Sequence, residues 1–125
     1  MSKNYFYLKK LEKIINIGFF SSGGGISKGD YHSLNCSKAN NDNNDNLLKN
    51  IEISKKNLDI SGKHLKLISQ IHSNKVIKID KKNYKSNLVG DGLITKDKDI
   101  ALGILTADCA PIFIFDYQTK IICSL

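Results

Sequence analysis

The stretch "LTADCAPIFIF" (residues 105–115) places an acid and a thiol, Asp108 and Cys109, in a run that is otherwise apolar. Successive apolar residues are typical of strands buried on both faces. We therefore expect "PIFIF" (111–115) and the preceding "IALGIL" (100–105) to be buried strands, with Cys109 at the end of one. An isolated cysteine is more often a small packing residue. The neighbouring Asp108 makes a function more plausible, because a carboxylate beside buried strands needs a hydrogen-bond or ion-pair partner.

The second half of the chain is dominated by short apolar runs separated by turn formers. The pattern predicts one helix near residues 46–58, with Asp45 or Asn46 as its N-cap. We expect the last strand to leave an exposed edge. The predicted strands are "KIINIGFF" (13–20), 65–71, 75–80, "DGLIT" (91–95) and "KIICSL" (120–125), besides the two named above.

Length and composition exclude several classes of protein. A chain of 125 residues with 41% hydrophobic content is expected to form one domain. The formal charge of +7 comes entirely from scattered lysines, and without arginine we expect no specific nucleic-acid binding. No apolar run reaches the roughly 20 residues of a membrane span or forms a signal peptide, so we expect a cytoplasmic protein without membrane contact. The three cysteines form no C-x-x-C pair and are expected to be thiols or metal ligands.

Two further segments carry candidate functional groups. The glycine loop "SSGGGISKGDYHSLN" (21–35) is either a flexible connection or a loop wrapped against a ligand, and it lacks the ending of a P-loop. His72 follows Gln70 in "SQIHSNKV" (69–76), and at strand spacing the two would share a face. From spacing alone, His72 and Cys109 are zinc ligands, a nucleophile pair or unrelated. We expect surface or packing roles for the remaining histidines and cysteines, which are His32, His64, Cys36 and Cys123.

Four segments occur in the order and approximate spacing of one family. They are "GGISKGDYHSLN", "SQIHSNKV", "DGLIT" and "LTADCAPIFIFD". From about Phe19 onward the sequence resembles the YfiH-like proteins, described as multicopper polyphenol oxidases (laccase domain) and as purine nucleoside phosphorylases with adenosine deaminase activity. The resemblance implies an α+β fold of packed β-sheets flanked by helices.

The resemblance also implies a set of site residues. The metal ligands would be His72, Cys109 and a histidine in a later H-A-G-W-[RK]-G segment, which these 125 residues do not contain. We therefore expect residues 1–125 to be the N-terminal part of a single YfiH-like catalytic domain whose C-terminal part is missing. Ser22 and Ile51 stand where family members often carry arginines. The implied catalytic residues are His72, Asp108 and Cys109, with Asp108 positioning a proton or supporting the metal, and the implied substrate-binding residues are Gly24, Gly25, Asn35 and Gln70.

The function implied by the resemblance is a zinc-dependent purine nucleoside phosphorylase. Its partners would be phosphate and a purine nucleoside (adenosine, inosine, guanosine or methylthioadenosine), and it would also deaminate adenosine. One alternative is a copper-dependent polyphenol oxidase, although the chain has only three histidines. A second alternative is an inactive fragment or binding module, because the third metal ligand is absent. The sequence carries no prediction of oligomeric state.

Overall fold

The computed structural model describes residues 5–7, 11 and 13–125. The chain divides into two compact units, Met1–Ser61 and Gly62–Leu125. The assignment of the whole chain to part of a single catalytic domain stays a prediction.

The first unit combines a strand pair with the long helix of the chain. Strands β1 (Tyr5–Tyr7) and β2 (Gly18–Phe20) pair in antiparallel orientation, and a short 3-10 helix follows at Gly29–Tyr31. The strand predicted within 13–20 is therefore present, although it covers only the last three residues of that range.

Helix α1 (Asn44–Asn57) confirms the predicted helix and begins two residues earlier than expected. The N-cap is Asn43 rather than Asp45 or Asn46, because the Asn43 side chain accepts a hydrogen bond of 2.8 Å from the N–H of Asp45. Lys55 and Lys56 lie in the last turn, where positive charge is favourable at the helix dipole. The buried side chains of the helix are Leu47 and Asn50.

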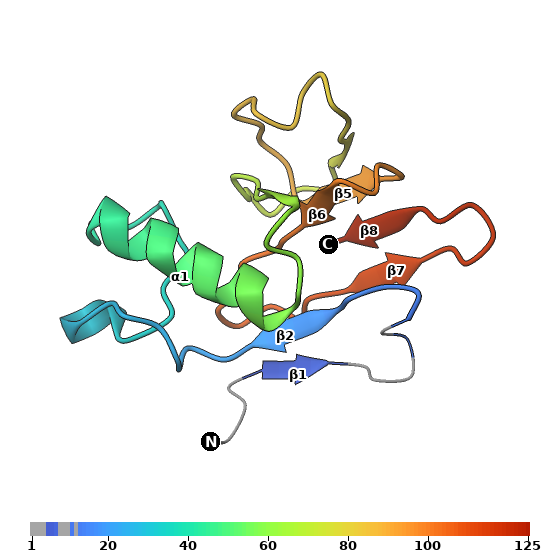
Figure 1. The fold of residues 1–125 in the computed structure, drawn as a ribbon. Coiled ribbons are helices and arrows are strands. Elements are labelled where there is room, and N and C mark those ends of the chain that lie inside the picture. The colour runs from blue at the N-terminus through green and yellow to red at the C-terminus, as the bar shows by residue number, and fades with distance from the viewer. Residues whose placement is uncertain (1–4, 8–10, 12) are drawn as a thin grey trace. The chain divides into compact units, whose positions relative to one another are not determined.

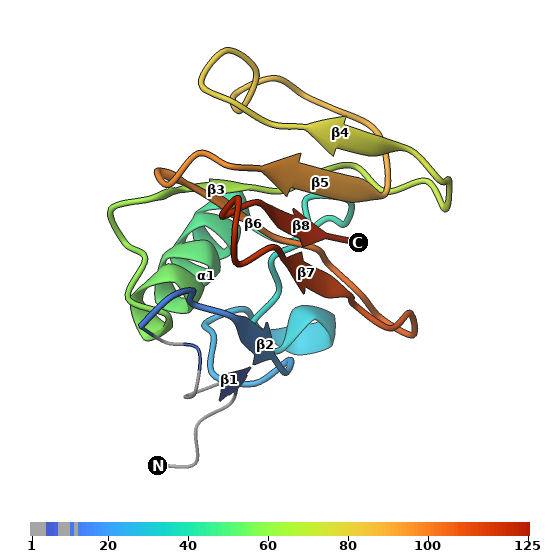
Figure 2. The same ribbon diagram turned by 90° about the vertical axis from the view of Figure 1, so that its right-hand side faces the viewer.

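The second unit is built from two sheets. Figure 2 shows the larger one, in which the strand order is β4-β5-β8-β7, with β4 and β5 parallel and the other pairs antiparallel. The smaller sheet pairs β3 and β6 in parallel. The strands are β3 (His64–Lys66), β4 (Val76–Lys78), β5 (Gly92–Thr95), β6 (Ile100–Leu102), β7 (Phe113–Phe115) and β8 (Ile122–Ser124). Among the described residues, these sheets and helix α1 of the first unit confirm the α+β class.

The core of this unit is a cluster of four buried aliphatic side chains. Each side chain of this size contributes about 1.5–3 kcal/mol when it is fully buried. Lys66, on β3, is also buried, and its Nζ donates a hydrogen bond of 2.5 Å to the carbonyl oxygen of Ser86. Burial lowers the pKa of this lysine below its ordinary value. The cluster consists of Ile68, Ile79, Leu93 and Ile100.

The prediction that residues 111–115 are buried on both faces is wrong. Ile112 and Ile114 are 52% and 54% exposed, and Phe113 is 39% exposed. Strand β7 lies at one end of the four-stranded order, so an apolar run here does not signal burial. The strand expected to leave an exposed edge, β8, lies between β5 and β7 (Figure 1).

The prediction for residues 100–105 is correct only at its start. Ile100 is 3% exposed, but the following residues are half-buried and the strand ends at Leu102. Among the described residues no helix is long and apolar enough to cross a membrane.

Candidate functional site

Two loops of the second unit carry the predicted metal ligands, and a hydrogen bond links them. We call residues 69–75 the His72 loop and residues 103–112 the Cys109 loop. The side-chain oxygen Oε1 of Gln70 accepts a hydrogen bond of 3.2 Å from the N–H of Leu105. Gln70, predicted to bind substrate, thus holds the Cys109 loop against the His72 loop.

The backbone of the His72 loop is fixed by one carboxylate, that of Asp91. Its Oδ1 accepts hydrogen bonds from the N–H groups of Ile71 at 2.9 Å and His72 at 2.8 Å. Its Oδ2 accepts from the N–H of Ser73 at 2.7 Å and from the Ser73 hydroxyl at 2.6 Å. The Ser73 hydroxyl and these backbone donors lower the pKa of Asp91 to about 2. Sequence reasoning missed this residue, although an Asp-Gly pair before a strand is a turn signal.

His72 itself lies in a left-handed conformation with a φ of 58°. The prediction that Gln70 and His72 share the face of a strand is therefore wrong, because residues 70–75 form no strand and alternation does not apply. For a residue other than glycine this conformation costs on the order of 1 kcal/mol. The His72 residue is exposed while its N–H is bound to Asp91, so the backbone is held and the side chain faces solvent.

Cys109 and Asp108 lie in a bend rather than at the end of a buried strand, and this prediction is also wrong. The chain leaves β6 at Leu102 and bends at residues 107–109 before reaching β7. Both residues are exposed, so no burial cost attaches to the Asp108 carboxylate, and Cys109 is an exposed free thiol rather than a packing residue.

The remaining histidines and cysteines lie where the sequence predicts them. His32 and His64 are exposed. Cys36 and Cys123 are half-buried free thiols, and burial raises the pKa of each.

The donor types of the second unit suit zinc, but their number is small. Imidazole and thiolate are both common zinc ligands, and a zinc site needs at least three protein ligands. Among the described residues, no three His, Cys, Asp or Glu side chains form a group that could hold a metal ion. Imidazole and thiolate thus fit zinc by type, and the described residues alone do not complete a zinc site.

In the first unit, the glycine loop is closed on itself. The carbonyl oxygen of Ser22 accepts hydrogen bonds from the N–H groups of Ser33 at 3.0 Å and Leu34 at 2.7 Å. Gly24 has a φ of 91°, which favours glycine. A Cβ on Gly25 would lie 2.3 Å from the Ser33 carbonyl oxygen. The Gly25 N–H donates to the Ser33 hydroxyl at 3.2 Å, so this predicted ligand donor has a partner inside the loop.

Asn50, on helix α1, supports the glycine loop and was missed by sequence reasoning. Its side chain is 0% exposed. Its Oδ1 accepts from the N–H of Ile26 at 2.9 Å, and its Nδ2 lies 2.8 Å from the carbonyl oxygen of Asn35 and 2.9 Å from the hydroxyl of Ser27. The available signal was its position three residues after Leu47, on the buried side of the predicted helix.

Asn35, predicted to bind substrate, uses its side chain within the protein. Its Nδ2 donates to Asp42 Oδ2 at 2.9 Å and to Asn40 Oδ1 at 3.1 Å, while its Oδ1 accepts from the N–H of Ser37 at 3.1 Å. Asp42 also accepts from the Ser27 hydroxyl at 2.6 Å. These hydrogen bonds, led by that of Ser27, lower the pKa of Asp42. Gly24, Gly25 and Asn35 thus lie in the first unit, and Gln70, His72, Asp108 and Cys109 in the second.

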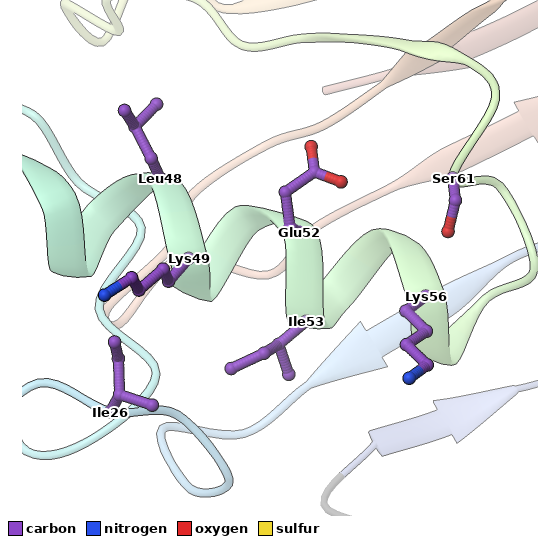
Figure 3. Close-up of a pocket in the computed structure, with 7 residues that line it drawn as sticks. All are labelled: Ile26, Leu48, Lys49, Glu52, Ile53, Lys56 and Ser61. Carbon is purple, nitrogen blue, oxygen red and sulfur yellow. The ribbon is translucent and has the colours of Figure 1, made fainter.

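A depression of about 520 Å³ on the first unit contains none of the predicted site residues. Its lining is mainly apolar and is open to solvent. Figure 3 shows Leu48 and Glu52 projecting from one side of α1 and Ile53 from the other. The lining residues are Ile26, Leu48, Lys49, Glu52, Ile53, Lys56 and Ser61.

Comparisons with known proteins place the chain in a family. The family model described as "Multi-copper polyphenol oxidoreductase laccase" matches residues 16–125. A purine nucleoside phosphorylase of Campylobacter jejuni is 50% identical over 58 residues, which are 46% of this chain and 24% of that protein. The purine nucleoside phosphorylase YlmD of Bacillus subtilis is 28% identical over 112 residues, which are 83% of this chain and 40% of that protein.

The fold is shared with a solved relative as well. The crystal structure of YfiH from Bacillus licheniformis matches with a TM-score of 0.84 at 21% identity, covering 98% of this chain and 49% of that one. The chain thus spans less than half the length of each of these relatives. The match over residues 16–125 shows that the chain belongs to the multi-copper polyphenol oxidoreductase laccase family.

Proposed function

We propose that this chain supplies part of the active site of a metal-dependent purine nucleoside phosphorylase. The observation that carries the proposal is the state of His72, whose backbone is held by Asp91 at 2.8 Å while the residue is exposed. A histidine held in this way is suited to bind a ligand. The naming of the relatives as purine nucleoside phosphorylases supports the choice of reaction.

His72 and Cys109 would hold the metal ion. We propose zinc, because it accepts imidazole and thiolate together, and we propose that the third ligand comes from a residue outside these 125. When bound, zinc would act as a Lewis acid that polarises an oxygen of the reactants. The exposure of Cys109 lets its sulfur reach such an ion, and Gln70 keeps the two ligand loops together through Leu105.

Phosphorolysis requires the protein to bind an anion and to stabilise charge on the departing purine. Within the first unit we assign the phosphate to the glycine loop around Gly24 and Gly25, which Asn35 supports through its hydrogen bonds inside the protein. Within the second unit we assign a part in nucleoside binding to Gln70. An anion would displace the Ser33 hydroxyl from the N–H of Gly25, because a charged acceptor forms the stronger hydrogen bond. Asp108, exposed beside Cys109, would hold or move a proton.

Adenosine deamination belongs to the same proposal as a second reaction of the same site. Copper-dependent oxidation of phenols is the weaker candidate, since multicopper oxidation uses several histidine-rich sites and these 125 residues contain three scattered histidines. A metal site that needs a donor from elsewhere also predicts that the 125-residue chain alone binds zinc weakly and turns over neither adenosine nor inosine. We place the protein in the cytoplasm, and nucleic acids and membranes are not among its proposed partners.

The test joins the chain in frame to the part of Bacillus subtilis YlmD that follows the matched region. We expect phosphate-dependent release of purine from inosine and adenosine, measured by chromatography. Activity should fall by at least about a hundredfold in Cys109→Ser and His72→Gln, since each variant loses a metal ligand.

Two matched controls make the result specific. Cys36→Ser and His64→Gln change the same residue types outside the proposed site and should keep activity within about threefold of the parent. Full activity of Cys109→Ser would overturn the metal site, and the absence of phosphorolysis by a folded fusion that contains zinc would overturn the function.

A further inference from the structure

The His72 loop is held by Asp91, a residue from another part of the second unit. Asp91 directly precedes β5 and lies 19 residues from His72 in the sequence. Its carboxylate collects the N–H groups of three consecutive residues together with one hydroxyl. Four donors converge on two oxygen atoms, so the carboxylate determines how the backbone turns at His72.

The direction in which the imidazole leaves the backbone depends on that turn. His72 has a φ of 58°, and in an extended conformation its Cβ would leave the chain on another side. A metal ligand must be held close to its productive geometry to bind tightly. Asp91 meets this requirement through the backbone of His72.

We propose that Asp91 is the positioning residue of the metal ligand His72, setting its side-chain direction through three backbone hydrogen bonds. The proposal rests on the proposed function, in which His72 binds the metal. Asp91 joins the proposed site through its hydrogen bond to the backbone of His72.

The test uses the 125-residue chain, with Co²⁺ alone as the probe. Thiolate-to-cobalt absorption reports binding that includes a cysteine. We expect this absorption in the parent chain at high Co²⁺ concentration and its loss in Cys109→Ser. Asp91→Ala should weaken the Co²⁺ affinity by at least about tenfold, the range typical for residues that orient metal ligands.

Graded variants separate positioning from a general loss of stability. Ser73→Ala removes one of the four hydrogen bonds and should weaken binding by about threefold. Asp91→Asn keeps the acceptor for His72 but turns a donor toward the N–H of Ser73, so its affinity should be intermediate. Asp116→Ala is the matched control, because Asp116 accepts hydrogen bonds from Gln118 and Thr119 after β7; its affinity should equal that of the parent.

A second readout needs no metal. In Asp91→Ala the backbone amide signals of residues 71–73 should move toward their unstructured positions in the nuclear magnetic resonance spectrum, while those of β5 stay. Two results would overturn the positioning role alone. One is unchanged amide signals of residues 71–73 in Asp91→Ala, and the other is a Co²⁺ affinity of Asp91→Ala equal to that of a parent that shows the thiolate absorption. If the parent chain shows no such absorption, the same measurement on the fusion with the Bacillus subtilis YlmD part decides, because that fusion supplies the missing donor. Absence of the absorption in the folded fusion would overturn the metal site of the proposed function, and the positioning role with it.

Discussion

The glycine loop of the first unit and the His72 loop of the second are each held by one side chain, and the two side chains have different chemistry. The glycine loop presents one N–H together with carbonyl and hydroxyl oxygens to Asn50, a neutral amide that both donates and accepts. The His72 loop presents only donors to Asp91, an ionised carboxylate that only accepts. The hydrogen-bond donors and acceptors that a loop presents thus determine whether an amide or a carboxylate can hold it.

The difference extends to burial. Asn50 is 0% exposed, whereas Asp91 is only half-buried. Removing a buried amide leaves unpaired polar groups, and these groups cannot form hydrogen bonds with water instead. A carboxylate at the surface can be replaced in part by solvent. We therefore expect substitutions at Asn50 to act mainly on stability and those at Asp91 mainly on the geometry of His72.

The largest loss of stability is expected for Asn50→Leu, which keeps the approximate volume of the side chain and removes every hydrogen bond that the side chain makes. The N–H of Ile26 and the carbonyl oxygen of Asn35 would lose their partner inside the protein. The free energy of unfolding should fall by roughly 3 kcal/mol, measured by urea denaturation. Lys49→Leu, one residue earlier on an exposed position of α1, is the control and should change it by less than about 0.5 kcal/mol. Equal effects of the two variants would contradict the stabilising role of the Asn50 side chain.

A smaller loss in the free energy of unfolding is expected for Gly25→Ala, which tests how closely the glycine loop packs against Asn50. A Cβ here would lie 2.6 Å from Asn50 Oδ1 and 2.5 Å from the Cα of Leu34. Both are too close, so the backbone must shift, at a cost of about 1–3 kcal/mol. At Gly62 an added Cβ meets nothing within 4 Å, and Gly62→Ala should be close to neutral in the same measurement. A neutral Gly25→Ala would show that the loop is held loosely.

The smallest effect is expected on the pH dependence of stability, to which a carboxylate contributes and an amide does not. The hydroxyl of Ser27 and the amide of Asn35 hold the pKa of Asp42 below its ordinary value. A lowered pKa contributes stability that is present above the ordinary value of about 3.9 and is lost as the pH falls through the folded-state value. Asp42→Asn should therefore reduce the decline of stability below about pH 4, followed by thermal unfolding across the acid range.

The stability that the Asn50 amide contributes does not depend on pH in this way, because an amide does not titrate. Asp45→Asn, at an exposed acid in the first turn of α1, is the control for Asp42→Asn. An acid profile that is the same in Asp42→Asn and in the parent would contradict the assignment of this carboxylate.

The sequence predicted the elements better than their surroundings. Apolar runs marked every strand of the second unit, because packing requires such runs wherever a strand forms. They did not show that 111–115 lies at an edge, since this depends on the order β4-β5-β8-β7. Likewise His72 and Cys109 stood out by residue type, but the conformation of His72 depends on Asp91, which lies 19 residues away. Asn50 was missed because a polar residue in a helix is usually read as exposed.

Strand β7 has a consequence for the behaviour of the chain in solution. Ile112 and Ile114 are more than half exposed, and an edge strand with apolar side chains can template the growth of a sheet from one molecule to the next. We expect aggregation of the isolated chain to rise steeply with concentration and to be slowed by Ile114→Lys. A charge on this strand should keep the chain monomeric at higher protein concentrations.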